Sequence, residues 1–539
     1  MKIEFILPLI ASVFLGSQAV ESQVSFRLCP SSMVWETDPL LVTHPLNSRI
    51  MLGTASVPQA PYGSSPRKYT TTNAGTTWLC NTDTILLPPW LPYYGAPRPV
   101  IDKNGMFIIV CFTAGATSSG LEAIRTSNNG VTWLSSTVST SSYAVGHRVG
   151  TDDMQSSPYY GRTYCVWSDL ALSIYRVVFS FTSDGGASWS PNTTLNAPPA
   201  GHYSYGADVV VGPDGIVYVT WAALTRFSPG NEDFYGFAKS ANGGETWQVT
   251  EDAFDGNGIR GVLPEKQNIR VNSSPRIAVD KTGGPRNGWV YIVTAEKNVA
   301  PAGSDPDILL HWSTDGGAAW THMRVNQDSV NNGKIQYFPA IAVDSAGGVN
   351  VVYYDDRTTT SDSSSVFLSR STNGGNTWQD NEVADHHFRP EPISGTTTGY
   401  QGDFIGIAAA GGKVWPIWVD NSSGLYQTWI TVVSICPVAV ANERLLPKVF
   451  SLQQNYPNPF NPSTTLRFEL PQKASVRVEV FDLLGRQVRK LVDSGFQPGS
   501  HEIVWDGMNN RGAGVASGVY ICRLVSGGRV ETRRMMLTR

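Results

Sequence analysis

Hydrophobic residues along this chain recur in short runs that are rich in β-branched and aromatic side chains, and Gly, Asp or Asn turns separate the runs. Residues 339–354 (PAIAVDSAGGVNVVYY) illustrate the pattern, with a turn between two apolar runs. Such runs are typical of antiparallel strands that tight turns connect. Similar segments occupy residues 40–53, 97–112, 207–221, 275–295 and 403–419, with a shorter one at 163–168. We therefore expect an all-β region of seven strand-rich units.

A second motif, Ser/Thr-x-Asp/Asn-x-Gly-x-x-Trp, occurs six times, at residues 71–78, 126–133, 182–189, 240–247, 313–320 and 371–378. The Trp-to-Trp spacings are 55, 56, 58, 73 and 58 residues. The Asp or Asn can accept hydrogen bonds from nearby backbone amides, the Gly can adopt a positive φ, and the Trp is an apolar plug. We therefore interpret the motif as a structural turn and assign it no catalytic role.

Repeats of about 56 residues that each form a four-stranded sheet are typical of a β-propeller. The seven strand-rich units predict seven blades, and the six turn motifs leave six blades as the alternative. In a closed ring, a strand at residues 24–28 would be the outer strand of the last blade, which removes the open edge between the first and last sheets. The predicted propeller spans residues 24–436.

The C-terminal part of the chain differs from the repeats. Residues 437–449 are predicted to be a linker, and alternating strands follow at residues 465–470, 475–481, 501–505, 518–524 and 530–537. Val476, Val478 and Val480 show the period of two that is typical of a half-buried sheet. Residues 450–539 therefore predict a small Ig-like β-sandwich.

The first 19 residues predict a secretory signal peptide. Lys2 precedes an apolar run at residues 6–16, and Ser17-Gln18-Ala19 is a small-x-small cleavage pattern. No other segment approaches the ~20 apolar residues that cross a bilayer. We therefore expect a mature protein without a membrane span, either secreted or at the cell surface.

Charge and motif content narrow the partners and cofactors. Only 16% of the 539 residues are charged and the net charge is −4, without a basic patch, so we expect no nucleic-acid partner. The chain has no EF-hand loop, P-loop or HExxH motif, so we expect no metal and no cofactor. Of the six cysteines, Cys29 follows the first mature strand and Cys436 follows the last strand of the repeats. A disulfide between them would join the ends of the ring, and the equally open alternative is six buried thiols.

The six turn motifs resemble the Asp-box (BNR) repeats of the sialidase superfamily. This resemblance implies a sialidase-like propeller, and for the family it implies three Arg on a sialic-acid carboxylate, a Tyr nucleophile activated by a Glu, and an Asp acid/base. The nearest match to the first Arg motif is Arg98, in the segment APRP at residues 96–99. Residues 112–116 (FTAGA) lack the second Arg and the Asp. We therefore expect a glycan-binding propeller, and a glycoside hydrolase such as a divergent exo-α-sialidase is the alternative.

Residues just before the innermost strands of a propeller converge on one mouth of its central channel. The candidate ligand-binding residues chosen in this way, for a glycan or another extracellular polymer, are Arg98, His147, Tyr205, Arg276, Tyr337, Gln401 and Asp403. Aromatic faces and fixed polar groups of this kind suit such a ligand. Candidates for catalysis, which no motif supports, are Arg98, Arg276, Glu296, Tyr354 and Arg357.

The C-terminal segment resembles the C-terminal sorting domain of cargo of the type IX secretion system. The matching segments are NYPNPFNP at residues 455–462, DLLGR at 482–486, WDG at 505–507 and ASGVY at 516–520. The resemblance implies that residues 450–539 address the protein to the type IX machinery. It also implies export through the periplasm and the outer membrane.

Overall fold

The computed structural model describes residues 24–30, 34–58, 66–81, 93–114, 119–128, 130, 132–170, 174–226, 230–435, 450–496 and 499–538. The chain divides into two compact units, residues 1–436 and 437–539. The predicted signal peptide and linker lie outside the described residues. Within the described part of the chain, no helix is long and apolar enough to cross a membrane.

The described residues of the first unit form seven antiparallel sheets of four or five strands, which we call blades 1 to 7, and a separate two-stranded hairpin. Blade 1 contains β2 (Thr37–His44), β3 (Asn47–Ser56), β4 (Arg67–Thr71) and β5 (Leu79–Asn81). Blade 2 contains β6 (Tyr93–Ile101), β7 (Phe107–Ala114), β8 (Ser119–Thr126) and β9 (Leu134–Ser139). Blade 3 contains β10 (Ala144–Thr151), β11 (Thr163–Asp169), β12 (Arg176–Thr182) and β13 (Thr193–Thr194). Blade 4 contains β14 (His202–Val211), β15 (Val217–Thr225), β16 (Glu232–Ser240) and β17 (Gln248–Asp255). Blade 5 contains β20 (Arg276–Val279), β21 (Val290–Glu296), β22 (Asp307–Ser313) and β23 (Thr321–Arg324). Blade 6 contains β24 (Gln336–Val343), β25 (Val349–Asp355), β26 (Ser365–Ser371) and β27 (Gln379–Glu382). Blade 7 is formed by β28 (Gly406–Ala410), β29 (Lys413–Asp420), β30 (Gln427–Ile430), β31 (Val433–Ser434) and β1 (Phe26–Arg27).

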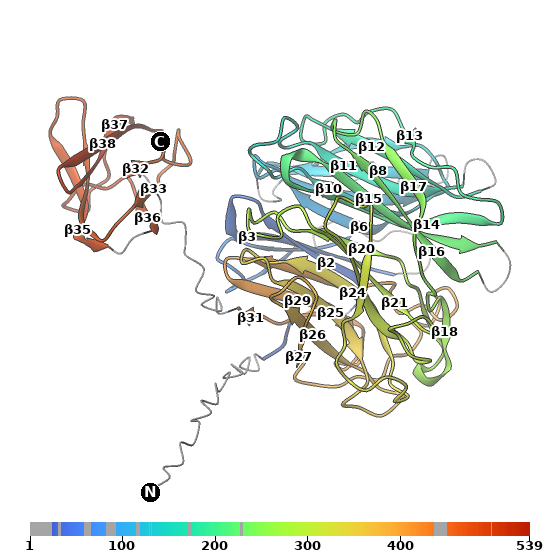
Figure 1. Cartoon of the computed structure of the whole chain (residues 1–539). Helices are drawn as coiled ribbons and strands as arrows, with labels where there is room; N and C mark the ends of the chain where they lie inside the picture. The colour runs from blue at the N-terminus through green and yellow to red at the C-terminus, as the bar shows by residue number, and fades with distance from the viewer. Residues whose placement is uncertain are drawn as a thin grey trace, which may run out of the picture. The chain divides into compact units, whose positions relative to one another are not determined.

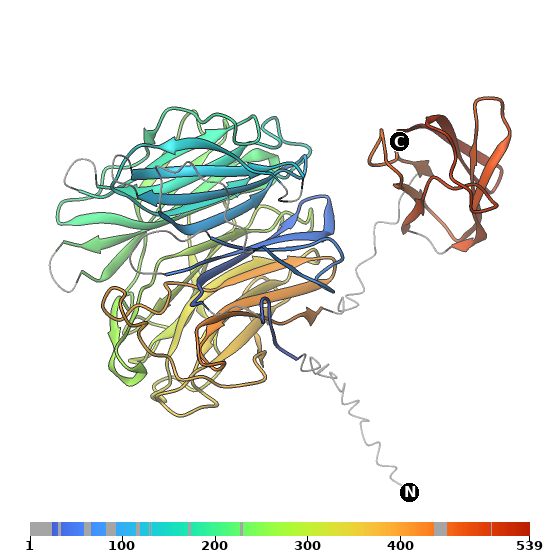
Figure 2. The same ribbon diagram turned by 180° about the vertical axis from the view of Figure 1, so that it is seen from behind.

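The first strand of each blade contacts the first strand of the next, and the contacts run from β2 through β6, β10, β14, β20 and β24 to β28 and back to β2. Figures 1 and 2 show the resulting ring, in which the blue strands of blade 1 lie beside the orange strands of blade 7. The prediction of seven blades is therefore confirmed, and the alternative of six is wrong.

The N-terminal segment closes the ring. Strand β1 pairs antiparallel with β30, with Phe26 opposite Ile430 and Arg27 opposite Trp429. Blade 7 thus takes its outer strand from the start of the chain, as the sequence predicted for residues 24–28. The pairing covers a sheet edge that would otherwise expose unpaired backbone groups.

The six Ser/Thr-x-Asp/Asn-x-Gly-x-x-Trp motifs, which we call boxes, lie in the turns between the third and fourth strands of six blades. In blade 3, Thr182 Oγ1 donates to Asp184 Oδ1 at 2.7 Å and accepts from the amide of Gly186 at 3.0 Å. Asp184 Oδ1 accepts from the amide of Ser188 at 2.9 Å. The box is therefore a hydrogen-bonded clamp for the turn.

The box tryptophans link neighbouring blades. Trp247 of blade 4 packs edge-on against Phe179 of β12 in blade 3, with ring centroids 5.0 Å apart. Trp320 of blade 5 makes the same kind of contact with Phe237 of β16 in blade 4, at 5.1 Å. Each of these rings therefore adds apolar contact where two blades meet.

The second unit is a β-sandwich. One sheet contains β32 (Ser451–Leu452), β33 (Thr464–Leu470) and β36 (Gly499–Trp505), and the other contains β35 (Gln487–Phe496), β34 (Ala474–Phe481), β37 (Gly518–Ser526) and β38 (Arg529–Leu537). Val476, Val478 and Val480 are fully buried between the sheets together with Phe468 and Trp505. The prediction of an Ig-like sandwich is confirmed.

A histidine ties the closing strand to blade 7. Asp385 Oδ2 accepts from the amide of Ser25, and the His386 ring contacts Asp385 Oδ1 at 2.8 Å and Asp420 Oδ2 at 2.9 Å. Burial alone would lower the pKa of His386, but the hydrogen bonds and charges of Asp420 and Asp385 outweigh it and raise that pKa above 6.5. Protonated His386 therefore stabilises this junction.

We expect Trp247→Ala to lower the free energy of unfolding of the propeller by about 2 kcal/mol, because it removes a half-buried ring from between two blades. Chemical denaturation followed by tryptophan fluorescence and circular dichroism measures the change. Leu134→Ala is the control, since the Leu134 side chain is 61% exposed. Equal stability of the two variants would contradict a role of the box tryptophan between blades.

We expect the stabilisation by His386 to depend on pH. Because the folded-state pKa is raised, the stabilising contribution is complete below about pH 6.5 and is lost as the pH rises through the folded-state pKa. His386→Asn should therefore lower the melting temperature more at pH 5.5 than at pH 8.5. His387→Asn, which removes a more exposed neighbour, is the control. The same difference at both pH values would refute the prediction.

Candidate functional site

The innermost strands of the propeller carry β-bulges at equivalent positions. The register shifts in β2, β6, β10, β14 and β24, at a residue with positive φ in each strand: Asp38 (56°), Ala96 (50°), Gly146 (62°), Gly206 (65°) and Phe338 (53°). At a bulge, two residues of one strand lie opposite one residue of the neighbouring strand. Side chains after the bulge therefore point to the opposite face from the one that the regular alternation would give them. Three of these positions hold a non-Gly residue in the left-handed region, which costs about 1–3 kcal/mol each.

Three arginines meet around one aromatic ring next to these bulges. Arg98 and Arg148 each follow a bulge by two residues, and Arg276 is the first residue of β20. Their guanidinium carbons lie 4.2, 4.1 and 5.2 Å from the centre of the Phe404 ring. The bulged strands therefore bring cations from blades 2, 3 and 5 to a single point.

These arginines line a cavity of about 450 Å³. The charged residues of its wall are Arg98, Arg148, Arg260, Arg270, Arg276, Asp38 and Asp403. Tyr205 and Phe404 contribute aromatic surface. Five arginines against two aspartates give the wall a formal charge of +3 in a chain whose net charge is −4. The cavity is therefore suited to an anionic ligand.

The arginines of the cavity are strongly desolvated. Burial, followed by the charge of Arg148, lowers the pKa of Arg98 to about 9, and burial also lowers the pKa of Arg148 and of Arg276. Arg98 Nε donates to the carbonyl of His147 at 3.0 Å, but Arg98 Nη1 has no hydrogen-bond partner among the described residues. A bound anion would satisfy this donor and favour the charged form of the three side chains.

Two aspartates face the arginines. Asp403 accepts from Arg270 Nε at 2.9 Å and Nη2 at 2.7 Å, which is a bidentate ion pair. Asp38 Oδ1 accepts from the amide of Asp403 at 2.6 Å, and Asp38 Oδ2 accepts from the hydroxyl of Tyr400 at 2.8 Å. Burial, with the charge of Asp403 second, raises the pKa of Asp38. The raised pKa favours the protonated form of Asp38.

An inserted hairpin forms one wall of the cavity. It consists of β18 (Gly261–Leu263), the short 3-10 helix η2 (Pro264–Lys266) and β19 (Ile269–Val271), between blades 4 and 5. The hairpin lies between the box tryptophans that are 73 residues apart, and it accounts for that long spacing. Arg260, Val262 and Arg270 of the hairpin region line the cavity.

The base of this hairpin is held by buried carboxylates. Glu232 of β16 accepts from the amides of Arg260 at 3.1 Å and Ser273 at 3.0 Å. It therefore holds the chain both before and after the hairpin. Glu296 accepts from the amide of Asn257 at 3.2 Å. The carboxylates of two blades thus fix where the insertion begins and ends.

The tip of the hairpin is held by a buried lysine. Lys266 Nζ donates to Asp356 Oδ2 and to the carbonyl of Ser363, each at 2.7 Å, and the Lys266 and Asp356 side chains are fully buried. Arg270 completes the attachment through its backbone amide, which donates to the carbonyl of Gly399 at 2.7 Å. The hairpin therefore reaches from blades 4 and 5 to the loops of blade 6 and of the segment before blade 7.

Four of the seven predicted ligand-binding residues line the cavity: Arg98, Tyr205, Arg276 and Asp403. The other three are buried and are not among its lining residues. His147 contacts the carbonyl of Val110 at 3.0 Å, and burial, with Arg98 second, lowers its pKa to about 3. Tyr337 hydrogen-bonds Ser364, and Gln401 accepts from the hydroxyl of Tyr426. The sequence reasoning missed Asp38, Arg148, Arg260, Arg270 and Phe404.

Three of the five catalytic candidates lie outside the lining of the cavity. Glu296 is buried against His311 at 2.9 Å, and the hydroxyl of Tyr354 donates to the carbonyl of Val419. Arg357 pairs with Asp355 and Asp380. These contacts are structural, and only Arg98 and Arg276 of the five lie in the cavity wall.

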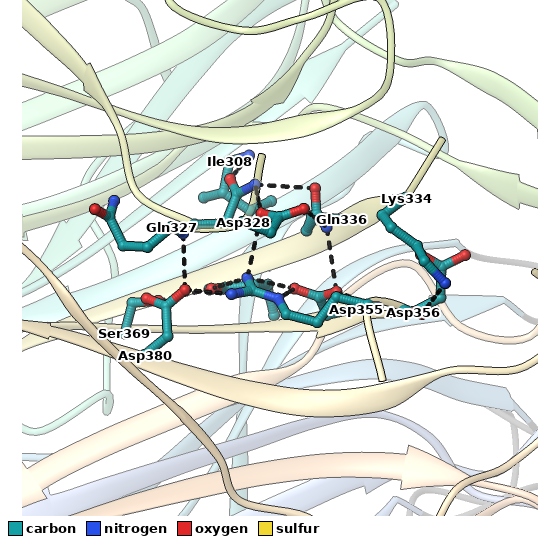
Figure 3. Close-up of polar contacts among 12 residues, drawn as sticks. Ile308, Gln327, Asp328, Lys334, Gln336, Asp355, Asp356, Ser369 and Asp380 are labelled. Atoms are coloured by element: carbon teal, nitrogen blue, oxygen red, sulfur yellow. Dashed lines mark hydrogen bonds and ion pairs between the residues drawn. The ribbon is translucent and has the colours of Figure 1, made fainter. Parts of the chain in front are cut away.

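The surroundings of Arg357 form a polar network between blades 5 and 6. Figure 3 shows Asp328, Gln336, Asp355 and Asp380 directed toward one another. Gln336 Nε2 donates to Asp355 Oδ1 at 3.1 Å, and the amide of Gln327 donates to Asp380 Oδ2 at 2.8 Å. The network joins two blades. The arginine and carboxylates at the end of β25 therefore have a structural role as members of this network.

The described residues contain no group of three or more His, Cys, Asp or Glu placed to hold a metal ion. The predicted disulfide between Cys29 and Cys436 involves a residue outside the described part of the chain, so it stays a prediction.

Comparison with known proteins adds three findings. A family model of the FlgD Ig-like domain matches residues 458–527, within the C-terminal sandwich. A search of curated proteins finds no match.

The third finding is a likeness to solved structures of carbohydrate-active enzymes. An α-L-arabinanase of Penicillium chrysogenum is 15% identical, with a TM-score of 0.41 over 66% of this chain and 98% of that one. A Hadza microbial sialidase is 10% identical, with a TM-score of 0.38 over 71% and 76%. An ulvan lyase of a polysaccharide lyase family is 9% identical, with a TM-score of 0.46 over 75% and 95%. At these values no residue role passes to this chain, and its site is argued from its own contacts.

We expect Lys266→Met to loosen the hairpin, because it leaves the buried carboxylate of Asp356 without its cation. Amide hydrogen exchange at residues 259–271 should become faster by about 100-fold, with little change in the blades. Mass spectrometry of peptic fragments measures this exchange. Lys281→Met, which removes a more exposed ion pair with Asp153, should leave the hairpin unchanged. Unchanged exchange in Lys266→Met would show that Lys266 does not hold the tip.

Proposed function

We propose that this protein is an exported propeller that binds a glycan with a carboxylate group in the cavity at the mouth of its channel. The observation that carries the proposal is the excess of arginine in the cavity wall, together with the buried Arg98 Nη1 that lacks a partner. Guanidinium groups bind carboxylates through paired hydrogen bonds. Tyr205 supplies an aromatic ring against which the apolar face of a sugar can pack.

Binding without hydrolysis is supported by the tyrosines near the cavity. Burial raises the pKa of Tyr205, and burial and the charge of Asp38 raise that of Tyr400. A tyrosine nucleophile needs a base that favours its ionised form. The described residues of the cavity wall include no Glu. The Tyr–Glu pair that the sialidase resemblance implies is therefore not supported at this site.

Glycoside hydrolysis is the second candidate, and Asp38 is the observation that favours it. A carboxyl group with a raised pKa can protonate the leaving oxygen of a glycosidic bond. Asp38 lines the cavity, and burial and Asp403 raise its pKa. Such an enzyme would be a glycosidase of the exo-α-sialidase kind or one that acts on another acidic sugar.

The inserted hairpin supports recognition of a chain end. It covers one side of the cavity mouth with Arg260, Val262 and Arg270, and it is attached at both its base and its tip. A wall that is held in this way leaves less room for a polymer to pass through the site than an open groove would. We infer that the terminal sugar of the glycan enters the cavity.

We propose that the C-terminal unit is an export address. Its sequence resembles type IX sorting domains, and the described residues fold as a separate Ig-like sandwich. In this proposal, residues 450–539 engage the type IX machinery after the signal peptide has directed the chain to the periplasm. The propeller would then act outside the cell or at its surface.

We expect the protein to bind 3′-sialyllactose or a glucuronate-terminated oligosaccharide, and to bind neutral lactose much more weakly. Arg148→Ala and Arg276→Ala should each weaken binding by at least about tenfold, because each removes a charge-assisted hydrogen bond. Isothermal calorimetry measures the affinities. Arg49→Ala, an exposed arginine of β3, is the matched control.

Equal affinity for lactose and the acidic sugars would contradict recognition of the carboxylate. Release of the fluorophore from a fluorogenic sialoside or glucuronide, abolished by Asp38→Asn, would instead identify the protein as a hydrolase.

A further inference from the structure

The strand that closes the ring is short and ends at a cysteine. Strand β1 has two residues, and the amide of Leu28 continues its ladder by donating to the carbonyl of Thr428 at 2.9 Å. Cys29 follows directly and is 4% exposed. The closure of the propeller therefore rests on a few backbone hydrogen bonds beside a buried thiol.

A second cysteine lies against this end of the strand. Cys80 belongs to β5, the outer strand of blade 1, and is opposite Tyr69 in the register of β4 and β5. Cys80 Sγ donates to the carbonyl of Leu28, the residue before Cys29, at 2.9 Å. The Cys29 thiol lies near enough to contribute, after burial, to the raised pKa of the Cys80 thiol. Both cysteines pack in one apolar cluster with Trp415.

Hydrogen bonds of Tyr69 connect the strands that carry the two cysteines. The hydroxyl of Tyr69 donates to Glu36 at 2.7 Å and bonds Thr428 Oγ1 at 3.0 Å. Thr428 is the residue whose carbonyl receives the amide of Leu28. Tyr69 therefore links β4, next to Cys80, with β30, next to Cys29, and holds the two thiols at one junction of blades 1 and 7.

We propose that Cys29 and Cys80 form a disulfide bond that joins the closing strand of blade 7 to the outer strand of blade 1. The bond would make the closure of the ring covalent at the point where the hydrogen-bonded strand is shortest. Of the other cysteines that the structure describes, it would leave Cys111, Cys165 and Cys522 as thiols, and these three are buried.

Formation of the bond removes two protons and two electrons from the thiols of Cys29 and Cys80. The acceptor is a disulfide, either of an envelope thiol oxidase or of oxidised glutathione, and it is reduced to two thiols. Burial raises the pKa of the Cys80 thiol, so the reactive thiolate is scarce once the ring has closed. We therefore expect the bond to form during folding in an oxidising compartment, which makes its presence in cells dependent on the proposed export.

The test is peptide mapping of the full chain after export into the periplasm of a bacterial host. The protein is alkylated without reductant, digested and analysed by mass spectrometry. We expect a cross-linked pair of peptides with Cys29 and Cys80, two hydrogen atoms lighter than the sum of the thiol forms. Alkylated Cys29 and Cys80 in both this sample and the refolded sample below, or a peptide that joins Cys29 to Cys436, would overturn the proposal.

A second sample separates the bond from the export. The full chain is refolded from denaturant with a mixture of reduced and oxidised glutathione, and mapped in the same way. A Cys29–Cys80 bond that is found in the refolded sample and not in the periplasmic sample supports the pairing but contradicts its formation in the periplasm. Alkylated Cys29 and Cys80 in both samples overturn the pairing itself.

The melting temperature is an independent measurement. A reducing agent should lower the melting temperature of the oxidised protein by about 3 °C or more and should not change that of Cys80→Ala. Equal sensitivity of the two proteins to the reducing agent would contradict the bond. Because the comparison is made within each protein, it does not depend on how much the substitution itself destabilises the fold.

Discussion

The packing of each blade against two neighbours is the constraint on which the rest of the propeller depends. A sheet in the ring has both faces covered only if the ring closes, and closure requires the first and last blades to share a junction. Strand β1 meets this requirement by pairing with β30, so that residues about 400 positions apart in the sequence form one sheet. The contacts of Tyr69, Cys29 and Cys80 gather at the same junction.

The two ends of each blade serve different purposes. At the outer end, the box motif clamps a turn and its Trp packs between two blades, as Trp247 does against Phe179. At the inner end, the bulged strands give up regular pairing and turn Arg98 and Arg148 toward the channel. The outer features repeat because they serve packing, whereas the inner side chains differ from blade to blade because they build one asymmetric cavity.

The sequence predicted the blades well and the cavity in part. Seven units, six clamps and the exchanged strand followed from repetition, which reports local structure that every blade needs. Arg98 and Arg276 were found because each stands at the start of the inner strand that the sequence predicted for a unit of regular pattern. In blade 3 the prediction fell on His147, one residue from Arg148, because the bulge at Gly146 breaks the period of two. Arg357 was chosen from its neighbours in sequence, and one of these, Asp355, is its structural ion-pair partner.

The sequence by itself determined the β-propeller, the closing strand and the C-terminal sandwich, and it favoured seven blades over six, because alternation and turn residues act over short distances. Only the tertiary structure decided which side chains share a space. Phe404 lies against arginines of blades 2, 3 and 5. The hairpin of residues 261–271 lines the cavity, whereas in the sequence it showed only as a longer spacing between two of the repeated tryptophans. These residues are far apart in the chain and meet because the ring places the inner ends of all blades around one axis.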